Sequence, residues 1–106
     1  MIILANAFSL NMLDTTEPCS VMIQPLSLEA VSKMISEGFT SAIGHASTAA
    51  VLTDMLSVGV AMQRTTVKLD LATKLIVAQF KGERLAEGST TLPAGATIEW
   101  LLVTLT

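Results

Sequence analysis

The sequence of 106 residues has few side chains with reactive chemistry, with one cysteine, Cys19, and one histidine, His45. A single cysteine excludes an internal disulfide, and one cysteine with one histidine is too few for the ligand cluster of a structural zinc site. The low cysteine content fits a reducing compartment. We therefore expect a cytoplasmic protein that uses neither disulfides nor structural zinc.

Basic side chains are also scarce. The chain has 6 Lys and Arg against 9 Asp and Glu, which gives a formal net charge of -3. A protein that binds long nucleic acids needs a broad basic surface, because it must match many backbone phosphates. The charge balance therefore excludes a long DNA or RNA partner, and any nucleotide ligand must be small.

Long apolar runs are missing, although hydrophobic residues make up 51% of the chain and the mean hydropathy is +0.63. The longest uncharged stretch, between Glu37 and Asp54, is interrupted by polar residues, whereas a membrane helix needs about 20 consecutive apolar residues. The first cation is Lys33, so the N-terminal segment lacks the basic start of a signal peptide. We expect no membrane partner, and we expect the apolar surplus to form a core and an interface with a second copy.

Apolar periodicity predicts short strands and two helices. The first helix is capped by Ser27 and stopped by Gly38, and the second starts at Ser47 or Thr48 and ends before Gly59. Pro25 is expected to end the second strand, and residues 7–13 form a loop with one helical turn. The predicted strands are 2–5, 19–24, 60–67, 74–80 and 97–105.

This order of elements predicts one α/β domain over residues 1–106, with a mixed β-sheet of about five strands flanked by α-helices. The topology of the sheet does not follow from the order alone. We see no internal repeat and no low-complexity segment. One core of this size fits the usual length of a single domain.

His45 is the first candidate for chemistry, because histidine is the side chain that changes charge near neutral pH. It lies in the segment Ser-Ala-Ile-Gly-His-Ala-Ser-Thr, just before the second predicted helix. One interpretation is a surface or capping histidine. The other is a ligand-facing histidine, since Gly44 leaves room for a ligand and the free N–H groups of a helix start hold phosphate well.

The second candidate is the pair Arg84 and Glu87, which share a face if residues 82–88 form a helical turn. A structural ion pair is one interpretation of this spacing. A phosphate site is the other, because arginine is planar and permanently charged, and the glycines at 82 and 88 let backbone approach a ligand closely. The chain has only one other arginine, Arg64.

Several common motifs are absent. The sequence has no phosphate-binding Gly-x-x-x-x-Gly-Lys loop, no Gly-x-Gly-x-x-Gly and no carboxylate cluster for a hard metal. Serines 9, 41 and 47 cannot be assigned as nucleophiles without a contact to His45. We therefore expect neither a metal nor a cofactor.

Three segments together resemble the viral ring nucleases, a type III anti-CRISPR family with relatives encoded in bacterial and archaeal genomes. They are Leu-Ala-Asn-Ala-Phe-Ser-Leu-Asn-Met-Leu at 4–13, Ser-Ala-Ile-Gly-His at 41–45 and Arg-Leu-Ala-Glu-Gly at 84–88. The resemblance covers nearly the whole chain. Its specificity lies in the combination, because each segment alone is modest evidence.

The resemblance implies a homodimer that binds cyclic tetra-adenylate across its two-fold axis and cuts it to linear di-adenylate without a metal or cofactor. This reaction would silence the ancillary nucleases of type III CRISPR immunity, as an anti-CRISPR or as signal turnover. By the resemblance His45 and Arg84 are catalytic and Glu87 is the carboxylate that supports the histidine. The expected ligand-binding positions are Asn6, Ser9, Gly44 and Gln79.

Two other functions remain open from the sequence. One is a non-catalytic sponge that holds cyclic tetra-adenylate without cutting it, and the other is a small nucleic-acid or protein-binding module. The presence of His45 together with Arg84 and Glu87 favours the enzyme over the sponge, since mere binding does not require an acid.

Overall fold

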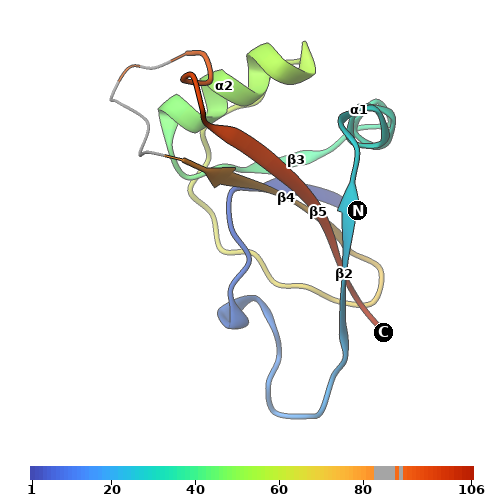
Figure 1. Cartoon of the computed structure of the whole chain (residues 1–106). Coiled ribbons are helices and arrows are strands. Elements are labelled where there is room, and N and C mark those ends of the chain that lie inside the picture. The colour runs from blue at the N-terminus through green and yellow to red at the C-terminus, as the bar shows by residue number, and fades with distance from the viewer. Residues whose placement is uncertain (83–87, 89) are drawn as a thin grey trace.

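The computed structural model describes residues 1–82, 88 and 90–106, and it confirms a single α/β domain with a mixed β-sheet (Figure 1). The described part contains five strands, two α-helices and one short 3-10 helix. The strands are β1 (Ile2–Ala5), β2 (Val21–Leu26), β3 (Thr40–Ala42), β4 (Lys74–Lys81) and β5 (Thr97–Leu105). The helices are η1 (Leu10–Met12), α1 (Leu28–Ile35) and α2 (Ala46–Leu56).

The strand order in the sheet is β2-β5-β4-β1-β3. Strand β1 lies between β3 and β4 and is parallel to both, whereas β5 is antiparallel to β4 and to β2. The carboxyl ends of β1, β3 and β4 therefore meet at the same edge of the sheet. That edge is where ligands usually bind in sheets with parallel strands.

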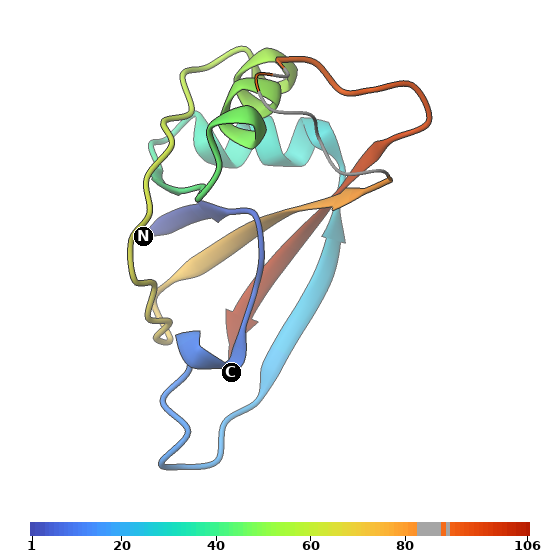
Figure 2. The same ribbon diagram turned by 90° about the vertical axis from the view of Figure 1, so that its left-hand side faces the viewer.

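Both helices cover one face of the sheet (Figure 2). Leu4 and Ile76 on that face pack with Val31 of α1 and Leu52 of α2, and all four side chains are fully buried. The other face packs against coil, through residues such as Val67. Alternate residues of each central strand serve the two faces, which explains why β1 and β4 are apolar nearly throughout.

Helix α1 begins at its expected cap. The Ser27 Oγ accepts a hydrogen bond from the Ala30 N–H at 3.1 Å, which satisfies one of the free donors of the first turn. The helix ends at Ile35, and Gly38 follows with a φ of 107°. Helix α2 begins at Ala46, slightly before the expected start at Ser47 or Thr48.

Two strand predictions were wrong. Strand β2 runs from Val21 to Leu26 and passes through Pro25, which pairs with Leu101. The sheet accepts proline there because β2 is an edge strand, where the missing N–H leaves no central ladder bond unmade. Residues 60–67 form no strand and contribute only a bridge between Ile43 and Met62.

The turn before β4 is fixed by Asp70. Its Oδ1 accepts hydrogen bonds from the Thr73 hydroxyl at 2.7 Å and from the Ala72 N–H at 2.9 Å. These bonds hold the pKa of the Asp70 carboxyl below its ordinary value. The bond from the Thr73 hydroxyl has the largest effect, and the bond from the Ala72 N–H has the next largest. This turn sets where β4 enters the sheet.

In the part of the chain that the structure describes, neither helix combines the length and apolar character needed to cross a membrane. The same residues contain no group of three or more His, Cys, Asp or Glu side chains placed to hold a metal ion.

Candidate functional site

A cavity of about 820 Å³ opens at the edge where the parallel strands end. Its volume lies in the range of small-molecule sites, which is about 300–1,000 Å³. The end of β1, the start of α2, the coil after α2 and the end of β4 all contribute to its wall. The residues that line it are Asn6, His45, Ala46, Ser47, Thr48, Met62, Arg64, Ala78, Gln79 and Phe80.

Gly44 does not itself line the cavity, but two residues that do line it hold its backbone. Its N–H donates to the Asn6 Oδ1 at 3.2 Å, and its carbonyl oxygen accepts from the Arg64 Nε at 2.9 Å. The residue after β1 and the residue before His45 are thus tied to each other and to the coil after α2. This arrangement fixes the backbone from which the His45 side chain projects.

The coil that carries Arg64 is itself fixed along β3. The Ser41 hydroxyl donates to the Ala61 carbonyl oxygen at 2.5 Å, and the Gln63 N–H donates to the Ile43 carbonyl oxygen at 2.8 Å. Ser41 is 8% exposed, and a buried hydroxyl with a partner is more costly to remove than an exposed one. The position of Arg64 therefore follows from a network of bonds and not from its own side chain alone.

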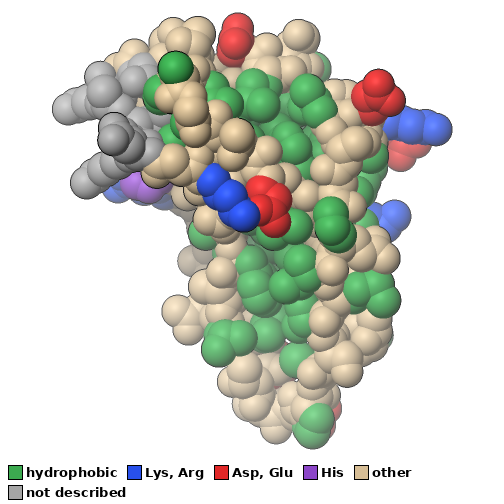
Figure 3. Space-filling view, viewed as in Figure 1, with side chains coloured by type: hydrophobic (Ala, Val, Ile, Leu, Met, Phe, Trp, Pro, Cys, Tyr) green, Lys and Arg blue, Asp and Glu red, His purple; other side chains and the backbone are tan. Residues whose placement is uncertain are grey.

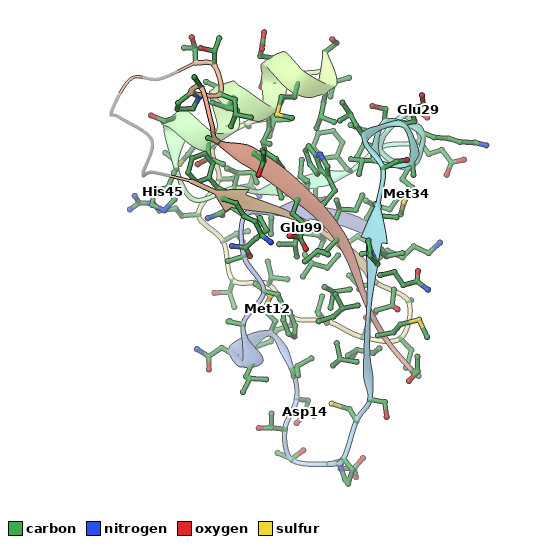
Figure 4. The ribbon with its side chains drawn as sticks, in the orientation of Figure 1. Met12, Asp14, Glu29, Met34, His45 and Glu99 are labelled. Atoms are coloured by element: carbon green, nitrogen blue, oxygen red, sulfur yellow. The ribbon has the colours of Figure 1, made fainter. Side chains whose placement is uncertain are left out.

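His45 is the N-cap residue of α2, with extended backbone angles of φ -132° and ψ 131°. Its exposed side chain makes no capping hydrogen bond, and it bonds to no other described residue. It lines the cavity close to where β4 ends (Figure 4). Among the described residues, neither nitrogen of the ring therefore has a partner.

The described wall of the cavity favours an anion. Arg64 carries a permanent positive charge, and no Asp or Glu is among the described lining residues. The N-terminus of α2 adds the partial positive charge of its first turn. An overall acidic chain thus has a locally positive site.

A family model described as STIV B116-like matches residues 2–95 of the chain. The chain belongs to the STIV B116-like family. Among solved structures, B116 of Sulfolobus turreted icosahedral virus is similar with a TM-score of 0.78 and 24% sequence identity, over 97% of each chain. No curated protein matches at a significant level.

Membership of the STIV B116-like family supports the resemblance to a viral family that the sequence suggested, because the solved structure of similar fold is that of a viral protein. The likeness to that structure establishes the fold alone. Ring nuclease activity, binding of cyclic tetra-adenylate and the homodimer stay predictions.

Three of the site residues that sequence predicts for this STIV B116-like chain come together in the cavity. The cavity is lined by Asn6, His45 and Gln79, although the first and the last of these lie 73 positions apart in the sequence. Gly44 lies beside them and binds Asn6. Ser9 does not line the cavity; it is exposed and caps the short helix η1, where its carbonyl oxygen accepts from the Met12 N–H at 3.1 Å.

Arg84 and Glu87 lie outside the described residues. Gly88, which follows Glu87 in the chain, is described, and its N–H donates to the Ser47 Oγ at 3.2 Å. The end of the 84–88 motif is thus bound to the first turn of α2, two residues after His45.

Arg64, Met62 and Phe80 also line the cavity, and sequence reasoning missed them as site residues. For Arg64 a signal existed, because it is one of only two arginines in an acidic chain. Met62 and Phe80 carried no signal, since apolar side chains at such spacing are typical of a core.

Proposed function

We propose that this chain is a metal-independent ring nuclease, which binds cyclic tetra-adenylate at a dimer interface and cleaves it to linear di-adenylate with 2′,3′-cyclic phosphate ends. Cleavage of this signal would switch off the ancillary nucleases of type III CRISPR immunity. The observation that carries the proposal is the meeting of Asn6, His45 and Gln79 in one cavity. The resemblance assigns these three residues to one ligand.

The chemistry needs no metal. A ribose 2′-oxygen attacks its own 3′-phosphorus in line, the bond to the 5′-oxygen of the next nucleotide breaks, and a cyclic phosphate remains. The leaving 5′-oxygen requires a proton, and the phosphate requires countercharge. We assign the proton to His45, the countercharge to Arg84, and the support of the histidine to Glu87.

One histidine cannot serve as acid and base at the same site at once. The 2′-hydroxyl proton is therefore passed to solvent, and the attack depends on alignment of the 2′-oxygen with the scissile bond. The fixed backbone at Gly44 supports this role, because a rigid site holds a substrate in the reactive geometry at little entropic cost.

A two-fold dimer supplies two copies of the site, which matches a ring whose symmetry relates opposite phosphodiesters. Two cuts then divide the ring into two equal halves. The surface offers apolar area for a partner, since Met22 and Ile23 on β2 are 45% and 53% exposed. Hydrophobic side chains gather over β5 and β2 in the space-filling view (Figure 3).

We expect cleavage of radiolabelled cyclic tetra-adenylate to continue in EDTA at the rate seen with magnesium, because His45 and Arg84 supply the acid and the charge. The measurement is separation of ring from linear product under single-turnover conditions, with a parallel incubation without protein as control. Activity that disappears with the chelator and returns with magnesium would contradict the mechanism.

We expect the protein to form a homodimer at micromolar concentration. Light scattering during size exclusion should give twice the chain mass of 11.2 kDa. Ile23→Lys, which places a charge on the exposed edge strand, should shift the mass towards the monomer if this surface is used. A wild-type protein that elutes only as a monomer would contradict a site shared across a two-fold axis.

A further inference from the structure

Ser41 belongs to the same segment as His45, but the proposed reaction gives it no task. In the described part of the chain, Ser41 and Thr73 are the buried polar side chains. The Ser41 hydroxyl donates to the Ala61 carbonyl oxygen at 2.5 Å, and Ser41 does not line the cavity. Its hydroxyl therefore faces the protein and not the ligand, which excludes Ser41 as a nucleophile.

This hydroxyl joins the turn between β3 and α2 to the coil after α2. While it donates to Ala61, it accepts from the Ile43 N–H at 3.4 Å. The coil continues beside Ile43, because Met62 forms a bridge with it and the Gln63 N–H donates to its carbonyl oxygen at 2.8 Å. The Ile43 backbone is thus bonded through both its N–H and its carbonyl, and its side chain is fully buried.

His45 follows Ile43 by two residues and depends on this anchoring. The His45 side chain makes no capping hydrogen bond, so among the described residues the direction of its ring is set by the backbone that carries it. Asn6 holds the Gly44 N–H from the end of β1. Ser41 holds the residue before Gly44 from the other side, through the coil.

We propose that Ser41 is a positioning residue, which fixes the turn between β3 and α2 so that the His45 ring meets the leaving oxygen. This inference rests on the proposed function, in which His45 supplies the proton. Without the hydroxyl, the Ile43 N–H and the Ala61 carbonyl lose their partner, and the turn must move to satisfy them elsewhere. A displacement of about 1 Å is enough to slow a reaction roughly 100-fold.

The test compares Ser41→Ala with Thr73→Val, because each variant loses one buried hydroxyl. The Thr73 hydroxyl bonds to Asp70, and neither of these residues lines the cavity. Both variants should melt at a lower temperature than wild type, since both lose a buried hydrogen bond. Only Ser41→Ala should also cleave cyclic tetra-adenylate more slowly.

The rates are measured in single turnover at saturating protein, at a temperature where circular dichroism shows all variants folded. We expect Ser41→Ala to cleave the bound ring about 10- to 100-fold more slowly, with a smaller change in affinity. Thr73→Val should cleave as wild type does. A wild-type rate for Ser41→Ala, or an equal loss in Thr73→Val, would overturn the proposal.

Two further variants separate the hydroxyl from the size of the side chain. Ser41→Thr keeps the hydroxyl and should recover most of the rate. Ser41→Cys offers a weaker donor, so its rate should lie between those of Ser41→Ala and wild type. If Ser41→Ala does not fold, Ser41→Cys carries the test, and a wild-type rate for folded Ser41→Cys would overturn the proposal.

Failure of the proposed function has a separate signature. If wild type neither binds nor cleaves cyclic tetra-adenylate, the ring nuclease proposal fails, and the orientation of the turn then tests Ser41 by itself. Residual dipolar couplings of the Gly44 and His45 N–H bonds report that orientation. They should change in Ser41→Ala and stay at wild-type values in Thr73→Val. Unchanged couplings in Ser41→Ala would overturn the positioning role.

Discussion

His45→Ala is expected to slow cleavage of cyclic tetra-adenylate by about 10² to 10⁴-fold, which is the usual effect of losing a general acid. Binding of the ring should stay close to wild type. The proton is needed by the leaving oxygen in the transition state, so its loss raises the barrier without weakening the ground-state complex. The His45 side chain makes no hydrogen bond with the described residues, so its removal should leave the fold intact.

The measurement pairs single-turnover cleavage with equilibrium binding. Gln63→Ala is a suitable control, because the Gln63 side chain is exposed and does not line the cavity. Its backbone N–H, which bonds to Ile43, is retained. Wild-type cleavage by His45→Ala would mean that the histidine is only the cap of α2.

Arg84→Ala is expected to lower both the affinity for cyclic tetra-adenylate and the rate at which the bound ring is cleaved. Its charge faces the reacting phosphate before and during the reaction, so the ground state and the transition state both lose a contact. A charged hydrogen bond is worth about 1.5–3 kcal/mol, which corresponds to roughly 10- to 100-fold in affinity. The rate should fall further, since negative charge grows at that phosphate as the bond breaks.

The same two assays measure the conservative variant at this position. Arg84→Lys should recover binding better than it recovers rate, since lysine keeps the charge but not the planar fork. If Arg84→Ala binds and cleaves the ring as wild type does, the role assigned to Arg84 is wrong.

Local sequence signals predicted the parts of the fold that local physics decides. Ser27 predicted the start of α1 because its hydroxyl satisfies a backbone N–H three residues on, which is the bond observed. The apolar β-branched runs predicted β1, β4 and β5, because strands buried on both faces need little alternation.

The wrong strand predictions depended on tertiary context. A proline ends a strand where a neighbouring strand needs its N–H as a hydrogen-bond donor. Strand β2, which contains Pro25, lies at the edge of the sheet, and the sequence alone did not indicate this position. Strand β3 has three residues, too few for a periodic pattern. Residues 60–67 resemble a strand in composition, but the described segment makes only one bridge, at Met62.

Some residues of the candidate site could likewise be predicted from the sequence, and others depend on the fold. Asn6 and His45 belong to motifs that could be recognised in the chain, and the fold places them in one cavity. Arg64 belongs to no motif. It reaches the site because Ser41 and Ile43 hold its coil beside β3, and these contacts join residues about 20 positions apart. Such a residue becomes visible only once the strands are paired.

Product analysis of uniformly labelled cyclic tetra-adenylate tests the central claim most directly. Excess protein in EDTA should convert the ring to linear di-adenylate with 2′,3′-cyclic phosphate ends, identified by mass and by opening of the cyclic phosphate in acid. Intact ring that stays bound to the protein would contradict the enzyme and would support the sponge. Ring that neither binds nor changes would contradict both.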